Sequence, residues 1–520
     1  MAQMKTPGVY IVEKNAFPNS VVEVSTAVPA FIGHTEMANH AGTTLCGRPW
    51  RISSMAEYHQ CFGFGPTPLF DIMLNAGSPS DTAFQVGGQN YLLTQPDGKA
   101  GGRYVLYYSL LHFFQNGGGP CYIVSVGDYQ TDVDGGALRT GIDRLIKEQE
   151  PTMVVIPEAV LLEQPECIAV QQAMLRHCGR MKSRVSILDI REGWKSQKDS
   201  NCVANFRNSL GIDDLDFGAV YYPWVNTTII RDKDLSFENI SPASRDLLID
   251  LLKEDLGLER PLAASATPKQ QQQSQLIDTI RKDFTVPAAG GPPLSAATVA
   301  ADKATFNRSL AAISGLFRTI LTVLKDRLNL LPPSGAMAGI YTMVDNTRGV
   351  WKAPANVSMN SVVSPAVNVS HEEQEELNVN PQGKSINAIR SFIGEGVLVW
   401  GARTLDGNSL DWRYINVRRT MIMLEESCRL AAQAMVFEPN TASTWVTIKA
   451  MISNFLTGIW KRGGLAGAVP EDAFSVHVGL GETMTPEDVL EGILRVTVLV
   501  AVSRPAEFIE ITFRQQMQKS

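Results

Sequence analysis

Helices and strands alternate between residues 103 and 189, and this order constrains the fold more than any other feature of the sequence. A helical pattern over 103–116 ends at three glycines, and the apolar strand CYIVSV follows. The order then repeats twice, with a helix and a strand over 139–150 and 152–156, and again over 166–181 and 184–189. Strands joined by helices form parallel sheets that are covered on both faces. The pattern therefore predicts a mixed α/β fold.

Composition changes along the chain predict several domains, as expected at 520 residues. VPAFIGHT is the first predicted core strand, and a β-rich run follows at 218–225. Helical spacing, a glutamine run and the connector VPAAGGPPLS then mark an inserted, surface-exposed helical region. Two amphipathic helices and three strands close the chain. The predicted parts are an N-terminal arm, a first α/β region, the insertion, a C-terminal core module and a C-terminal arm, at 1–27, 28–231, 232–331, 332–503 and 504–520.

Charge and hydropathy exclude several functional classes. The 46 Lys and Arg against 53 Asp and Glu give a net charge of −7, which argues against nucleic acid as the main partner. No apolar run reaches the ~20 residues that span a bilayer, and the first residues do not resemble a signal peptide. We therefore expect folding in a cytoplasm, with the seven cysteines reduced and mostly buried.

Motifs for catalysis, cofactors and metals are incomplete throughout. The glycines at 117–119 precede a strand, whereas a phosphate loop opens a helix. HEEQE, at 371–375, has Glu375 where a zinc motif needs a second histidine, and DVDGG lacks the last acidic ligand of a calcium loop. We therefore assign no catalytic, cofactor-binding or metal-binding residue. An enzyme with a site at the carboxyl edge of its sheet, built from distant residues, stays open as an alternative.

Both ends of the chain carry a predicted strand without an obvious local partner, at 8–13 and 505–513. In the second strand, Phe508, Glu510 and Thr512 alternate with the apolar set Ile509, Ile511 and Phe513. Each strand either folds back onto its own chain or completes the sheet of another molecule.

Five sequence blocks, in order, resemble the contractile tail sheath proteins of myophages, R-type bacteriocins and extracellular contractile injection systems. They are TPGVYIVEK, VPAFIGHT, FFQNGGGPCYIVSV, LPPSGAMAGIYTMVDNTRGVWKAPAN, and a C-terminal block with VFEPN, GIWKRGGLAGAVPEDAFSVHV and TPEDVLEGILRVTVLVAVSRPAEFIEITF. The resemblance implies a structural subunit that polymerises as stacked rings around an inner tube and contracts to drive the tube through a target envelope. The segment 232–331 departs from compact members of the family.

The resemblance also implies where subunits meet. In the family, terminal arms complete a discontinuous α/β core in neighbouring subunits. The arm residues so implied are Val9, Tyr10, Ile11, Val12, Phe508, Ile509, Glu510, Ile511, Thr512 and Phe513. A helix of the C-terminal module faces acidic tube residues in the family, which implicates Lys449, Lys461 and Arg462; a solvated helix end is the alternative reading of these cations.

The partners implied are further copies of the chain, the inner tube protein, and baseplate and cap proteins, with no nucleic acid and no membrane insertion. The subunit would be made in the bacterial cytoplasm and built into a phage tail or tail-like particle. A tube or baseplate component of the same machine is a further alternative.

Overall fold

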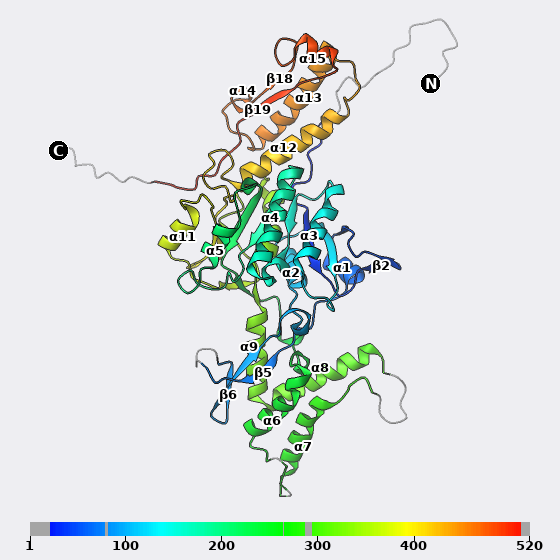
Figure 1. Cartoon of the computed structure of the whole chain (residues 1–520), viewed down its shortest axis with the longest axis vertical. Coiled ribbons are helices and arrows are strands. Elements are labelled where there is room, and N and C mark those ends of the chain that lie inside the picture. The colour runs from blue at the N-terminus through cyan, green and yellow to red at the C-terminus, as the bar shows by residue number, and fades with distance from the viewer. Residues whose placement is uncertain (1–20, 78–81, 260, 264, 287–293, 511–520) are drawn as a thin grey trace, which may run out of the picture. The chain divides into compact units, whose positions relative to one another are not determined.

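The computed structural model describes residues 21–77, 82–259, 261–263, 265–286 and 294–510 (Figure 1). The chain forms two compact units. The sheet unit takes 27–344 and 354–415, and the C-terminal unit takes 21–26, 345–353 and 416–510 of the described residues. Because strands at 387–400 pair with the central sheet, residues 354–415 belong to the sheet unit. The predicted division at residues 28, 232, 332 and 504 stays a prediction.

A nine-stranded sheet is the core of the sheet unit. Its strand order is β14-β17-β16-β11-β10-β9-β1-β8-β4. The strands are β1 Pro29–His34, β4 Trp50–Ile52, β8 Cys121–Gly127, β9 Met153–Val155, β10 Val185–Asp189, β11 Gly218–Tyr222, β14 Val357–Ser358, β16 Asn387–Phe392 and β17 Gly396–Trp400. Neighbouring strands from β8 to β16 run parallel, whereas β4, β17 and β14 add antiparallel edges. The predicted largely parallel sheet is confirmed.

Both faces of this sheet are covered. Every residue of β1, β10 and β11 is buried, which requires cover on the two faces to which alternate side chains point. The helices of this part of the chain are α1 Met55–Phe62, α2 Leu106–Gln115, α3 Gly135–Arg144, α4 Gln164–Met181, α5 Cys202–Ser209, α10 Ser334–Arg348 and α11 His371–Asn378. The three predicted helix–strand repeats correspond to α2–β8, α3–β9 and α4–β10.

The insertion folds together with a segment far from it in sequence. Helices α6 Arg245–Asp255, α7 Pro268–Asp278, α8 Ala296–Ile313 and α9 Gly315–Leu328 share one apolar core with the antiparallel strands β5 Asp71–Leu74, β6 Phe84–Val86 and β7 Gln89–Thr94. The rings of Phe237, Phe284 and Phe306 contact one another within this core in tilted and edge-to-face arrangements. The helical content predicted for 232–331 is present, but its core is completed by 70–93.

Two smaller sheets also belong to the sheet unit. Strands β12 Val225–Thr227, β13 Leu330–Leu331 and β15 Val362–Pro365 form one of them, and β2 Asn39–His40 pairs with β3 Thr43–Thr44. Since β12 precedes the insertion and β13 is formed by its last two residues, their pairing brings the two ends of the insertion together.

The C-terminal unit is built on two helices, α12 Ile415–Gln433 and α13 Ala442–Lys461. Their apolar stripes, spaced three and four residues apart, meet Val350 and Trp351 in a separate core. The short helices α14 Pro470–Ala473 and α15 Pro486–Leu490 accompany a ribbon of β18 Phe474–His477 and β19 Thr497–Val500. This ribbon precedes the C-terminal arm.

Candidate functional site

The antiparallel ribbon of β18 and β19 is the part of the C-terminal unit suited to receive further strands. Val498 and Val500 pack on the helical core, whereas Leu499 between them is 58% exposed. Among the described residues this sheet has two strands, and a two-stranded ribbon is marginally stable without further cover. Its outer edges therefore leave backbone groups available for pairing with another chain.

The chain leaves this ribbon as the C-terminal arm. The backbone is held as far as Val502, which pairs with Leu465, and the Ser503 hydroxyl donates to the carbonyl of Gly463. Beyond it, the described residues 504–510 form no helix or strand. Phe508 and Ile509 are 75% and 79% exposed, and Glu510 is exposed as well. Of the predicted arm residues, Ile511, Thr512, Phe513 and the set Val9, Tyr10, Ile11 and Val12 lie outside the described residues.

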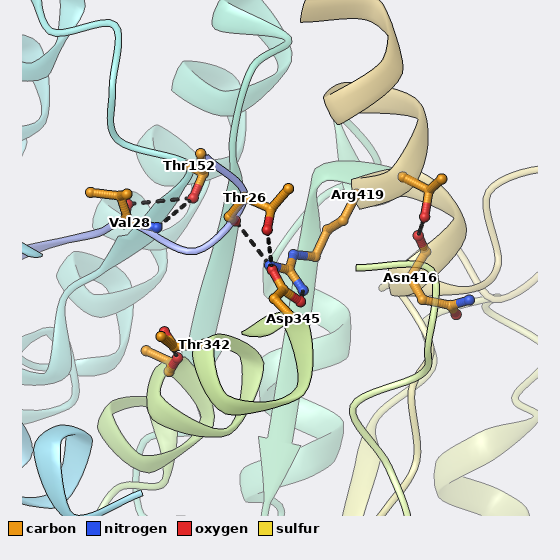
Figure 2. A network of polar contacts seen from close by, with 9 residues as sticks. Thr26, Val28, Thr152, Thr342, Asp345, Asn416 and Arg419 are labelled. Carbon is orange, nitrogen blue, oxygen red and sulfur yellow. Dashed lines mark hydrogen bonds and ion pairs between the residues drawn. The ribbon is translucent and has the colours of Figure 1, made fainter. Parts of the chain in front are cut away.

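The N-terminal segment is attached to the C-terminal unit through a buried ion pair (Figure 2). Arg419 of α12 binds both carboxylate oxygens of Asp345, at 3.0 and 2.6 Å, and also donates to the carbonyl oxygen of Thr26 at 3.0 Å. The Thr26 hydroxyl donates to the same carboxylate at 2.6 Å. Arg419 and Asp345 are 4% and 2% exposed. The arrangement satisfies both charges away from water.

Two further contacts hold the residues just before Thr26. The backbone N–H of Val24 donates to the buried Ser427 hydroxyl of α12 at 3.1 Å. Glu23 pairs with Arg462 at the end of α13, and the Arg462 guanidinium lies 5.2 Å from the centre of the Trp351 ring. The attachment therefore joins residues 23–26 to both helices of the unit.

The predicted tube-contact cations lie in different surroundings. Lys449 and Lys461 are exposed on α13. A hydrogen bond from His477, together with the charge of Lys449, lowers the pKa of Glu482 on the neighbouring surface. Arg462 instead binds Glu23 of its own chain. Lys449, Lys461 and Arg462 thus stay predicted candidates for an external contact, and Arg462 also contributes to the N-terminal attachment.

A buried pair lies at the carboxyl edge of the central sheet, where an enzyme site was the alternative. His34 at the end of β1 contacts Glu158 through its ring Nδ1 at 2.7 Å and its backbone N–H at 2.9 Å, and both side chains are buried. Burial alone would lower the pKa of His34, but the Glu158 carboxylate outweighs it and raises that pKa. Glu158 lies against Gly33, where a Cβ would stand 2.9 Å from its carboxylate oxygen. A dissolved substrate does not reach these groups in this conformation.

The described part of the chain contains no metal-binding centre. There, no group of three or more His, Cys, Asp or Glu side chains is placed to hold a metal ion. His371 instead contacts Glu375 one helical turn away, at 3.2 Å on the surface of α11. Five of the seven cysteines are buried, which confirms the prediction that the thiols are mostly buried.

Among the described residues, no helix combines the length and the hydropathy that a membrane crossing requires.

The attachment of residues 23–26 was not predicted from the sequence. Its signal lay in charged residues placed within apolar helical stretches, Asp345 after GIYTMV and Arg419 before TMIML. A charge on the buried face of a helix needs a partner. The sequence does not say which partner it has, because Thr26, Asp345 and Arg419 are far apart along the chain.

Comparisons with known proteins point in one direction. The profile of the family described as phage tail sheath C-terminal domain matches residues 408–516. The chain is 25% identical over 193 residues to the tail sheath protein of Vibrio phage KVP40, and 23% identical over 155 residues to that of Enterobacteria phage T4. The matched segments cover 36% and 30% of this chain, and 27% and 23% of those two proteins. The chain thus spans about a quarter of the length of these curated relatives.

Solved structures match over nearly the whole chain. A chain of the anti-feeding prophage helical sheath in its contracted state is 28% identical, with a TM-score of 0.59, covering 99% of this chain and 100% of that one. A chain of the sheath complex of an extracellular contractile injection system, PVC, also in the contracted state, is 26% identical, with a TM-score of 0.58 and 99% coverage of both. Residues 408–516 therefore match the tail sheath C-terminal domain, and the chain as a whole is similar in sequence and in fold to chains of contractile sheaths.

Proposed function

We propose that this chain is a structural subunit of a contractile sheath, which polymerises as stacked rings around an inner tube and contracts to drive that tube through a target envelope. The observation that carries the proposal is the C-terminal arm, which leaves a two-stranded ribbon and exposes Phe508 and Ile509. A lone strand gains little in water, whereas adding it to an open sheet edge pairs its backbone groups. The similarity to contracted sheath chains supports the same reading.

The arms exchange between copies in this proposal. Residues 505–513 of one subunit, and 9–12 of another, add to the edges of the β18–β19 ribbon of a neighbour. Backbone hydrogen bonds supply the affinity, and the alternating side chains of Phe508 to Phe513 select the face that turns inward. A lattice joined in this way deforms without coming apart, because the pairing moves with each ribbon.

The remaining partners follow from the proposed machine. Lys449 and Lys461 are proposed to contact an acidic inner tube, through exposed ion pairs worth about 0 to 1 kcal/mol each. Weak individual contacts suit a tube that must be released. Baseplate and cap proteins would bind at the ends of the polymer. The 232–331 region, together with strands β5, β6 and β7, would lie on its outer surface. Assembly would take place in the bacterial cytoplasm, and no catalytic step is assigned to the chain.

Electron microscopy of the purified chain tests this proposal. We expect striated tubes or short hollow cylinders at high protein concentration. Compact particles of one subunit, at every concentration and in the presence of the tube protein, would contradict it.

A further inference from the structure

The contacts of residues 23–26 form a single attachment, which we call the arm anchor. It consists of the Glu23–Arg462 pair, the Val24–Ser427 hydrogen bond, and the bonds of Thr26 with Asp345 and Arg419. The arm anchor lies directly after the predicted N-terminal arm residues. Any pull on that arm reaches these contacts before the rest of the chain.

The buried ion pair between Arg419 and Asp345 is the strongest contact of the arm anchor. Arg419 binds Asp345 through two nitrogens, a geometry that adds directional specificity to the charge attraction. Asp345 lies in the last turn of α10, at the negative end of the helix dipole, so its charge does not favour its own helix. The carboxylate instead serves Arg419 and Thr26, which fixes the segment to α12.

The position of Thr26 along the chain gives this attachment a mechanical meaning. Thr26 ends the first of the three segments that make up the C-terminal unit, and Ala27 is the first residue of the sheet unit. Val28 is already bonded within the sheet unit, where its N–H donates to the Thr152 hydroxyl at 2.9 Å and its carbonyl accepts from the Thr152 N–H at 2.8 Å. Two separate sets of bonds therefore flank one residue.

We propose that the arm anchor bears load: it passes tension from a neighbouring copy on the N-terminal arm into α12 and α13, and keeps that tension off β1. This inference rests on the proposed exchange of arms and adds the residues that carry the force. It makes the C-terminal unit the mechanical link at both ends, because the C-terminal arm also leaves from that unit.

Full-length variants test the inference at two levels. Thr26→Val removes one hydroxyl from the arm anchor and leaves the ion pair, whereas Arg419→Met removes the pair. The matched control is Thr420→Val, at the residue that follows Arg419 in α12. It deletes a buried hydroxyl that donates to the carbonyl of Asn416 and is not part of the arm anchor. Hydrogen exchange by mass spectrometry on soluble subunits measures how firmly residues 23–26 are attached. Micrographs of sheaths before and after triggered contraction show whether the sheaths break under load.

We expect exchange in the peptide 21–27 to quicken about five-fold or more with Thr26→Val, and further with Arg419→Met, but not with Thr420→Val. Sheaths of the two anchor variants should assemble and then break into short pieces on contraction, while control sheaths stay whole. Unchanged exchange, or contracted anchor-variant sheaths as long as the wild type, would overturn the load-bearing role alone. If the wild-type chain forms no polymer, the proposed function fails and the load-bearing role fails with it.

Discussion

Two buried aspartates, Asp345 and Asp189, have different partners for their carboxylates. Asp345 faces the guanidinium of Arg419, so its charge is balanced. Asp189, at the end of β10, accepts the backbone N–H of Ser334 at 2.9 Å. Burial raises the pKa of Asp189 to about 7, although the hydrogen bonds of Ser334 act in the opposite direction. The first aspartate should contribute through its partner, and the second should make stability depend on pH.

Asp189→Asn tests the pH dependence. An unfolded aspartate titrates near pH 4, so between about pH 4 and 7 the folded chain binds more protons here than the unfolded chain does. Stability should therefore fall as the pH rises through this window, by at most about 1.4 kcal/mol per pH unit for one proton. Urea unfolding of the wild type and the Asn variant from pH 5 to 8 should show this decline in their difference. A difference that is flat across the range would contradict the assignment.

The Arg419–Asp345 pair should show strong coupling. Removing one partner leaves a buried, uncompensated charge, so Arg419→Met should cost about 3 to 5 kcal/mol of stability. The double variant Arg419→Met with Asp345→Leu should recover much of that loss, because no charge then stays buried. A double-mutant cycle by thermal and urea unfolding measures the coupling. Independent, additive effects of the two substitutions would show that the pair is not a unit.

The C-terminal arm is the element on which assembly should depend most directly. Ile509 is largely exposed, so Ile509→Pro should change subunit stability by no more than about 0.5 kcal/mol. Proline removes a backbone donor and so blocks strand pairing. Light scattering should therefore show loss of polymerisation with Ile509→Pro and retention with the matched Ile509→Val. Normal polymers from the proline variant would mean that this strand does not pair in the lattice.

Local elements could be predicted from the sequence, whereas long-range partners could not. The helix–strand repeats at α2–β8, α3–β9 and α4–β10 follow from periodicity and glycine stops, which are local signals. The pairing of β16 with β11 joins Asn387 to Tyr221 across the whole insertion, and no local pattern specifies it. The three strands β5, β6 and β7, which complete the core of the insertion, were missed for the same reason. The arm anchor could not be predicted either, because Thr26, Asp345 and Arg419 come from three separate segments of the chain.

The insertion should behave as part of a two-segment subdomain when it is removed. Deleting 232–328 alone should leave Phe70, Phe84 and Tyr91 uncovered, and we expect this variant to aggregate. Replacing both 70–100 and 232–328 by short linkers should restore solubility. The ends of each cut are close, since Leu69 donates to the carbonyl of Gly101 and Asn329 bonds the backbone of Ile230. Size-exclusion chromatography compares the single-deletion variant with the variant in which both segments are replaced. A soluble, monodisperse variant that lacks only 232–328 would contradict the claim that the two segments share one core.

The two units of the molecule contain different functional parts. The sheet unit holds the covered parallel sheet and the insertion, while the C-terminal unit holds the ribbon, the anchored N-terminal segment and the start of the C-terminal arm. Contraction in this account repacks sheet units while the ribbons and arms keep the copies joined.

A cryo-electron microscopy map of the assembled chain tests the central claim most directly. We predict that residues 505–513 of each copy, and 9–12 of another, run as strands along the edges of a neighbour's β18–β19 ribbon. A polymer in which every copy keeps both end segments on its own ribbon would contradict the account.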